Sequence, residues 1–281
     1  MRKPKYLSPS ALMTYNKDPD EYFLKYLGPR LPRLPQTRPM SVGSAFDAEV
    51  KIYISNVFYG AGSSESIRLG SGFEDGVEPH NRDWARVAGS VCFEAYRKSG
   101  ALSRLMTLLK GAEPVMEASL QGSPFDGDCV LMGKPDLFFY TADGAPVILD
   151  WKVNGYCSKA SPKAGYQICL DGWGLDMPVG GGFSGSPSRS HNKSHKDYMG
   201  GLVGGVEVNI GSFFETVHAD WALQCATYSW LCDHALASCS KVIIVGIDQL
   251  ACDGTKIRVA QHRGQVSRDF QVIVRSQYEK L

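Results

Sequence analysis

The spacing of hydrophobic positions divides the chain into a helical first part, a strand-rich middle and a mixed end. Hydrophobic residues recur every three or four positions in amphipathic helices and every second position in half-buried strands. By this criterion the predicted helices run from Ser8-Pro9 to Gly28, restarting at Asp18-Pro19, and cover 41–58, 82–98, 101–110 and 218–237. The predicted strands are Val115–Leu120, Cys129–Tyr140, Pro146–Val153, 241–249, 256–261 and 269–275, with loops at 29–39 and 60–80. This order predicts an α/β domain with a central mixed sheet flanked by helices.

The dipeptide Asp143-Gly144 separates two of the predicted strands, Cys129–Tyr140 and Pro146–Val153. Asp-Gly between hydrophobic runs is a strong signal for a short β-hairpin. If the turn lies there, Asp136 on the first strand lies within about one register step of Asp150 on the second, and such cross-strand neighbours are about 5 Å apart.

Composition and charge limit the kinds of protein that this sequence can encode. The 281 residues are 43% hydrophobic and 21% charged, which is typical of a globular chain, and we predict a single domain over 1–281. Because the net charge is only +1, a nucleic acid would have to be bound by a local basic patch. No segment approaches the roughly 18 apolar residues of a membrane span. We expect a cytoplasmic protein with reduced cysteines and no membrane partner.

Residues 171–211 differ from the rest of the chain, because they contain eleven of its 30 glycines. A stretch of this composition buries little apolar surface. We predict a mobile Gly/Ser-rich insertion within the domain.

The chemistry of the predicted hairpin depends on three charged side chains. Asp150 and Lys152 are two residues apart on one strand and therefore point to the same face. The carboxylates of Asp136 and Asp150 repel each other at this distance unless a cation lies between them. Oxygen ligands favour Mg²⁺ or Mn²⁺, and an adjacent lysine can orient a water or stabilise charge on a phosphate. The alternative is a surface hairpin that carries an ordinary Asp–Lys pair.

The segment from Pro135-Asp136 to Asp150-Trp151-Lys152 resembles the signature of the PD-(D/E)xK nuclease superfamily. Three other segments are similar to its RecB-like and lambda-exonuclease-like branch: Ser8–Tyr22 to the opening helix, Val42–Asp47 to the helix that normally carries a metal-binding histidine, and Trp221–Tyr228 to the Q-x-x-x-Y helix. The resemblance covers most of residues 8–230 in the expected order. It implies a restriction-endonuclease-like core.

The resemblance also implies roles for individual residues. Asp136 and Asp150 would bind metal, Lys152 would position the attacking water, and Gln224 and Tyr228 would approach the scissile phosphate. The alternative for the last two is a helix that only packs Tyr228 into the core. Asp47 stands where relatives have histidine, either as a metal ligand or only as a helix-solvating residue. The backbone carbonyl of Val153 would be a further ligand by analogy alone. Glu117, on the strand before the hairpin, is either an additional acid near the metal or a solvated residue.

Other cofactors are not expected. Cys225, Cys232 and Cys239 recur every seven residues on one predicted helix face, which favours core packing, and Asp18 stands where some relatives have the first cluster cysteine. We therefore predict no iron–sulfur cluster. His191 and His195 have helical ligand spacing, but their polar neighbours indicate a loop, so we predict no zinc site.

Six basic residues are candidates for phosphate contacts, with solvated loops as the alternative. They are Arg30, Arg33, Arg38, Arg189, Lys193 and Lys196.

The sequence therefore predicts a Mg²⁺- or Mn²⁺-dependent DNA nuclease, preferably an exonuclease of recombination or repair that acts on single- or double-stranded ends. The origin could be viral, in which case the location would be the host cytoplasm. The alternatives are a non-catalytic nucleic-acid-binding relative and a structure-specific endonuclease. A homo-oligomer and a recombination partner protein are both left open.

Overall fold

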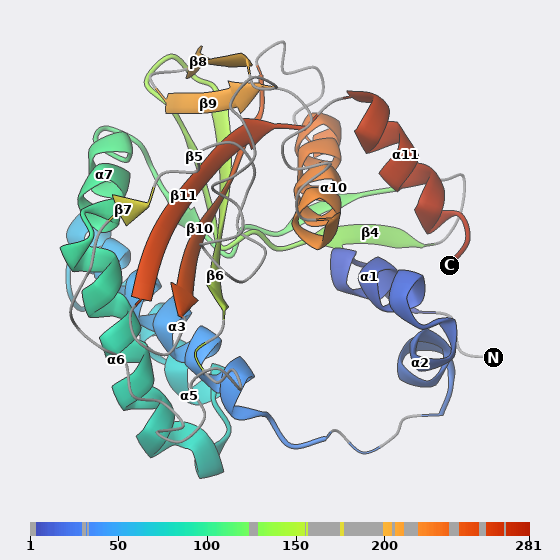
Figure 1. Ribbon diagram of the computed structural model, residues 1–281, viewed down its shortest axis with the longest axis horizontal. Coiled ribbons are helices and arrows are strands. Elements are labelled where there is room, and N and C mark those ends of the chain that lie inside the picture. Colours follow the sequence, from blue (N-terminus) through green and yellow to red (C-terminus); the bar gives the residue numbers. More distant parts are fainter. Residues whose placement is uncertain are drawn as a thin grey trace.

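The structure of the protein is a computed structural model. It describes residues 4–29, 32, 34–123, 129–154, 156, 175–176, 199–203, 206–210, 219–235, 242–252, 257–266 and 268–281. These residues form a mixed α/β arrangement in which a twisted sheet separates two groups of helices (Figure 1). The predicted α/β class is confirmed.

The large sheet has the strand order β2-β5-β6-β10-β11-β9-β8, with β7 also pairing with β11. Strands β5 and β6 form an antiparallel hairpin, β6 and β10 are parallel, and β10 and β11 are antiparallel. The strands are β2 (Val115–Met116), β5 (Leu137–Tyr140), β6 (Pro146–Asn154), β7 (Leu175–Asp176), β8 (Met199–Val203), β9 (Val206–Ile210), β10 (Ile244–Cys252) and β11 (Ile257–Gln265). Within the described residues, a smaller sheet has the order β1-β4-β3, formed by Tyr6–Leu7, Val130–Gly133 and Leu120–Gly122.

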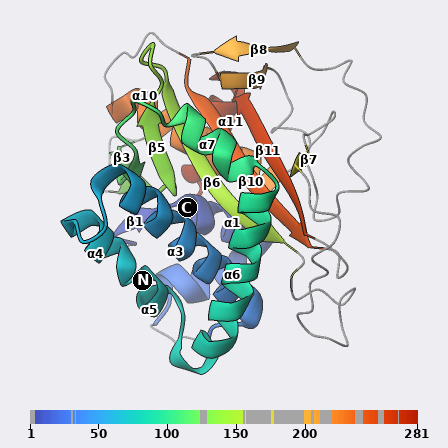
Figure 2. The ribbon, with the colours of Figure 1, turned by 90° about the vertical axis from the view of Figure 1, so that its left-hand side faces the viewer.

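One face of the large sheet is covered by helices from the first part of the chain (Figure 2). These are α3 (Arg38–Tyr59), α4 (Ser64–Gly70), α5 (Gly72–Gly76), α6 (Arg82–Lys98) and α7 (Ala101–Leu108), with a 3-10 turn at Pro79–Asn81. Phe46, Tyr96 and Leu105 of these helices are fully buried and pack in one core with Phe139 and Leu149 of the sheet.

The opposite face is covered by helices from the two ends of the chain (Figure 1). They are α1 (Pro9–Lys17), α10 (Ala219–Ala235) and α11 (Arg268–Tyr278), and α1 is followed by α2 (Pro19–Tyr22) and a π-helical turn at Phe23–Leu27. A second core joins Leu12, Ile148, Tyr228 and Val274. Successive residues of β6 therefore contribute to different cores, which is the expected alternation of a strand buried on both sides.

The N-terminal helix boundaries follow the predicted caps. The Ser8 hydroxyl accepts a hydrogen bond from the Ala11 N–H at 3.2 Å, and Pro9 occupies the first turn. The Asp18 carboxylate accepts from the Asp20 and Glu21 N–H groups and starts the next helix. Asp18 is therefore a helix cap in the structure.

Two sequence predictions are wrong. The predicted loop at 60–80 contains α4 and α5, because Ser63 caps α4 and Leu69 packs in the core with residues of α3. The predicted strand at 269–275 is helix α11, whose buried residues Gln271, Val274 and Tyr278 have the three-to-four spacing of a helix face.

Two predicted strands are interrupted. Val115–Leu120 breaks at Glu117, which has a φ of 55°, in the left-handed region. Cys129–Tyr140 breaks after Gly133, so that its halves join different sheets. Of the predicted insertion at 171–211, the described residues are those of β7, β8 and β9, and the rest of that prediction lies outside the described residues. No helix in the described part of the chain is long and apolar enough to cross a membrane.

Candidate active site

The β5–β6 hairpin brings Asp136 and Asp150 together. Its turn contains Gly144 with a φ of 80°, and Leu137 pairs with Leu149, so that Asp136 lies opposite Asp150. The Asp136 N–H donates to Asp150 Oδ1 at 3.3 Å, and the Trp151 N–H donates to Asp136 Oδ2 at 2.9 Å. The predicted hairpin and its register are therefore confirmed, and backbone hydrogen bonds hold both carboxylates in place.

The second carboxylate oxygen of Asp150 contacts two of the predicted residues. Asp150 Oδ2 forms an ion pair with the Lys152 ammonium, and the Gln224 side-chain amide donates to the same oxygen at 2.8 Å. Gln224 comes from α10, so this contact joins a helix and a strand that are 74 residues apart in the chain.

Tyr228 fixes the position of Gln224. The Gln224 amide donates to the Tyr228 hydroxyl at 2.9 Å, and that hydroxyl donates to the backbone carbonyl of Lys134 at 3.1 Å. Because Gln224 and Tyr228 are four residues apart, they share the helix face that points to the hairpin. Tyr228 is buried in the core as well, as the alternative interpretation of this helix predicts.

A second group of charges lies between α3 and the hairpin, where α3 and β6 are in contact (Figure 1). The Lys51 ammonium contacts Asp47 Oδ2 at 2.6 Å, Asp136 Oδ1 at 3.1 Å and Glu117 Oε1 at 3.2 Å. Sequence reasoning named all three acids but missed Lys51. The available signal was its spacing, since Lys51 is four residues after Asp47 on a helix.

Burial shifts the proton affinity of these acids in different directions. Burial, followed by the charge of Asp136, raises the pKa of Asp47 to about 8 and that of Asp150 to about 6. Burial opposes ionisation of Asp136 too, but the ammonium groups of Lys51 and Lys152 outweigh it and hold the Asp136 pKa below its ordinary value. Burial also disfavours the charged lysines, yet the adjacent carboxylates raise the pKa of both. Both lysines are therefore ammonium groups, and Asp136 is the acid that remains most readily ionised.

The chemistry of this donor set fits a hard divalent cation, because all the candidate ligands are oxygen atoms. Asp47 Oδ1 is buried and has no hydrogen-bond partner among the described residues. In the same part of the chain, however, no group of three or more Asp, Glu, His or Cys side chains has an arrangement that could hold a metal ion. The Lys51 ammonium lies among three of the carboxylates instead.

Two other predicted site residues belong to the described part of the chain. Val153 is three residues beyond Asp150, about 10 Å along the strand, and pairs with Leu250 of β10. Arg38 is exposed at the start of α3, with its guanidinium 5.5 Å from the centroid of the Trp84 ring. The remaining candidates for phosphate contacts lie outside the described residues: Arg30, Arg33, Arg189, Lys193 and Lys196.

The cysteines and histidines that relate to other cofactors are also placed only in part. Cys225 and Cys232 belong to α10 and are buried in the core, with exposures of 3% and 1%. Burial raises the pKa of the Cys225 thiol. Cys239, His191 and His195 lie outside the described residues.

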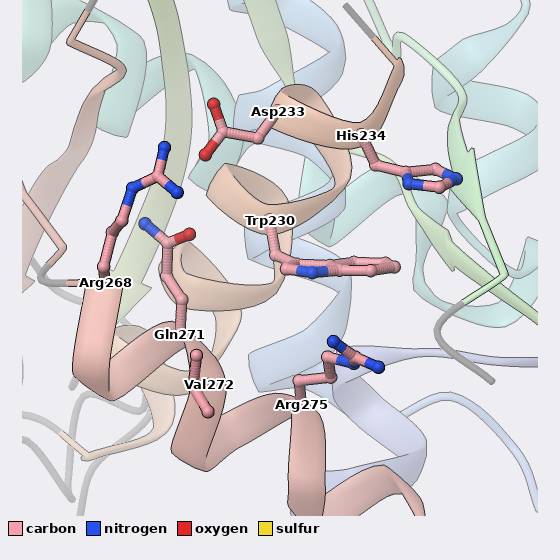
Figure 3. Close-up of a pocket in the computed structure, with 7 residues that line it drawn as sticks. All are labelled: Trp230, Asp233, His234, Arg268, Gln271, Val272 and Arg275. Atoms are coloured by element: carbon pink, nitrogen blue, oxygen red, sulfur yellow. The ribbon is translucent and has the colours of Figure 1, made fainter. Parts of the chain in front are cut away.

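A cavity of about 390 Å³ lies between α10 and α11, lined by Trp230, Asp233, His234, Arg268, Gln271, Val272 and Arg275. Figure 3 shows the Trp230 ring between His234 on one side and Arg275 on the other. None of its lining residues belongs to the carboxylate cluster, so this cavity is not part of the candidate site.

Comparisons with known proteins leave the function open. No protein-family model matches the chain, and no curated protein matches it either. Among solved structures, one titled "Crystal structure of SSO0001" is similar over 96% of this chain and 82% of that chain, with 10% sequence identity and a TM-score of 0.30. A likeness of this size carries no argument about fold or function.

Proposed function

We propose that the protein is a divalent-metal-dependent deoxyribonuclease with a restriction-endonuclease-like core. The observation that carries the proposal is the hairpin in which Asp136 and Asp150 face each other while Asp150 contacts Lys152 and Gln224. Paired carboxylates beside a lysine are the equipment of metal-assisted phosphodiester hydrolysis. An exonuclease of recombination or repair that acts on DNA ends in the cytoplasm is the preferred form, because the sequence resemblance points to that branch.

Asp136 and Asp150 would hold Mg²⁺ or Mn²⁺, with Asp47 from α3 as an additional oxygen donor. When bound, the ion would lower the pKa of a water and neutralise charge that develops on the phosphate. Lys152 is partly exposed beside Asp150, so its ammonium can donate to the attacking water or to a phosphate oxygen. Gln224 and Tyr228 keep the Asp150 carboxylate from rotating away.

Cleavage of labelled DNA tests this function. The wild type should degrade linear DNA in the presence of Mn²⁺ or Mg²⁺, and Asp150→Asn and Lys152→Ala should abolish cleavage. Matched substitutions of exposed residues, Asp83→Asn and Lys110→Ala, should leave it unchanged. Equal cleavage by the wild type and both site variants would mean that another site or a contaminant is responsible.

The form of the substrate decides between the kinds of nuclease. A time course with 5′- and 3′-labelled duplexes and single strands gives the polarity and strand preference. An exonuclease leaves closed-circular DNA intact, whereas a structure-specific endonuclease cuts it.

A non-catalytic nucleic-acid-binding protein is the second candidate, and the ion pairs of Lys51 favour it. Lys51 compensates carboxylates that would otherwise require a metal. This candidate predicts salt-dependent DNA binding without cleavage in either metal.

A further inference from the structure

Lys51 is buried in the centre of the candidate site rather than at its surface. Its side chain is only 4% exposed, and it comes from α3 one turn after Asp47. A buried ammonium is costly unless it is paired, and this one is paired three times. An ammonium group has three N–H donors, and three carboxylates lie within 2.6–3.2 Å of Lys51 Nζ. The surroundings of Lys51 are thus those of a bound cation.

The backbone at Glu117 supports a specific role for this contact. Glu117 has a φ of 55°, in the left-handed region that residues with a side chain rarely adopt. Its N–H donates to the Asp136 carbonyl at 3.1 Å, and its side chain reaches Lys51. The strained residue therefore joins the strand end that carries Asp136 to the ammonium of Lys51.

The charges of the whole cluster indicate how many further ions it requires. Its four acids are Asp47, Glu117, Asp136 and Asp150, and its two ammonium groups are those of Lys51 and Lys152. With all four acids deprotonated, as metal binding requires, four negative charges less two positive charges leave two negative charges. Arg68 does not change this count, because it lies 2.6 Å from Glu65 but 3.9 Å from Glu117. One divalent ion would balance the remainder, and a second would leave an excess of positive charge.

We propose that the Lys51 ammonium occupies a cation subsite formed by Asp47, Glu117 and Asp136, so that the chain binds one divalent ion, on the Asp136–Asp150 side, rather than two. This inference rests on the proposed function and specifies its metal requirement. The subsite cannot hold both cations. A Mg²⁺ ion must lie about 2.0–2.1 Å from its oxygen ligands, and the ammonium already fills the space between these carboxylates.

Titration with Mn²⁺ alone, followed by calorimetry and by the electron paramagnetic resonance signal of free Mn²⁺, tests the proposal without any measurement of activity. The wild type should bind one Mn²⁺ per chain. Lys51→Met, which keeps most of the length of the side chain and removes its charge, should bind two. Lys110→Met, on an exposed lysine, should still bind one.

A second variant keeps the proposal testable if Lys51→Met does not fold. Glu117 is 45% exposed, so Glu117→Gln should fold. If Lys51 fills the subsite, Glu117 is not a metal ligand, and the Mn²⁺ affinity should change by less than about threefold because only a screened charge is lost. If Glu117 is a ligand, the affinity should fall by about tenfold or more, as it does when groups that support a metal are removed.

Each outcome separates this inference from the proposed function. The inference would be overturned if the wild type bound two Mn²⁺ ions, or if the wild type and Lys51→Met each bound one ion with equal affinity. Either result is compatible with cleavage of DNA and so leaves the proposed function intact. No Mn²⁺ binding and no cleavage by the wild type would overturn the proposed function, and the single-ion inference with it.

Discussion

Gly133, the last residue of β4, lies directly against the Tyr228 ring that supports the candidate site. A Cβ atom at this position would be 2.7 and 2.8 Å from two ring carbons of Tyr228 and 2.9 Å from Leu231 Cδ1. Favourable carbon contacts lie at about 3.5–4.0 Å. The ring cannot turn aside freely, because the Tyr228 hydroxyl is bonded to Lys134 and Gln224. Gly133→Ala therefore forces both the core and the site to shift.

Overpacking of this kind costs about 1–3 kcal/mol, and the lower chain entropy of alanine offsets about 0.5–1 kcal/mol. We expect Gly133→Ala to lower the free energy of unfolding by about 1–2 kcal/mol, or the melting temperature by about 2–4 °C for each kcal/mol. Urea unfolding and thermal melting measure both values. Cleavage should also slow, because the ring displaces the Gln224 amide from Asp150.

Gly43→Ala is the matched control, since it makes the same chemical change in the opposite setting. Gly43 is inside α3, and nothing lies within 4 Å of the position that a Cβ atom would take there. Alanine should stabilise this helix by about 0.5–1 kcal/mol. If Gly133→Ala and Gly43→Ala change the free energy of unfolding in the same direction and by the same amount, the inference that Tyr228 packs closely on Gly133 is wrong.

Three further predictions concern the site and the core behind it. Gln224→Ala should slow cleavage by about 10–100-fold with little change in melting temperature, and an unchanged rate would remove Gln224 from the site. Without metal, the free energy of unfolding should fall as the pH rises from 3.8, the ordinary pKa of an aspartate, to about 8. The reason is that Asp47 and Asp150 retain protons in the folded state that the unfolded chain has already lost. Added Mn²⁺ should reverse this loss, and urea midpoints between pH 5 and pH 8 that rise without metal would contradict the assignment. Tyr96→Phe should lower the free energy of unfolding in urea by about 1.5–3 kcal/mol, because the Tyr96 hydroxyl donates to the fully buried Asp248 carboxylate. A negligible change would show that this hydrogen bond does not stabilise the core.

The parts of the fold that could be predicted from the sequence are those with strong local signals. Ser8-Pro9 and Asp18-Pro19 start helices because each combines a capping side chain with a proline in the first turn. Asp143-Gly144 determines the hairpin register, and through it the pairing of Asp136 with Asp150. The C-terminal segment 269–275 resembles a strand because it contains the β-branched run Val272-Ile273-Val274, whereas in the structure Val272 is 61% exposed and Val274 is buried. Packing against α10 stabilises this segment as a helix, whose buried residues recur every three or four positions, rather than as a strand with alternate residues buried.

Only part of the candidate site could be predicted from the sequence, because the rest depends on contacts between distant segments of the chain. Asp136, Asp150 and Lys152 are joined by one local hairpin, so local rules place them together. Lys51 reaches the same point from α3, and its contact with Asp136 spans 85 residues. A lysine four residues after an aspartate on a helix normally indicates a surface ion pair, and the sequence does not reveal that this pair is covered by the hairpin.

Asp47 and Lys51 have one physical explanation when taken together. The proposed resemblance would set Asp47 where a metal-binding histidine, a neutral imidazole, is expected. Aspartate there adds one negative charge to a site that already has Asp136 and Asp150 within reach, and burial makes that charge expensive. Lys51 supplies the compensating positive charge one helical turn away, at 2.6 Å from Asp47. When Asp47 is ionised, the Asp47–Lys51 pair adds no net charge to the site, which is also the contribution of a neutral imidazole.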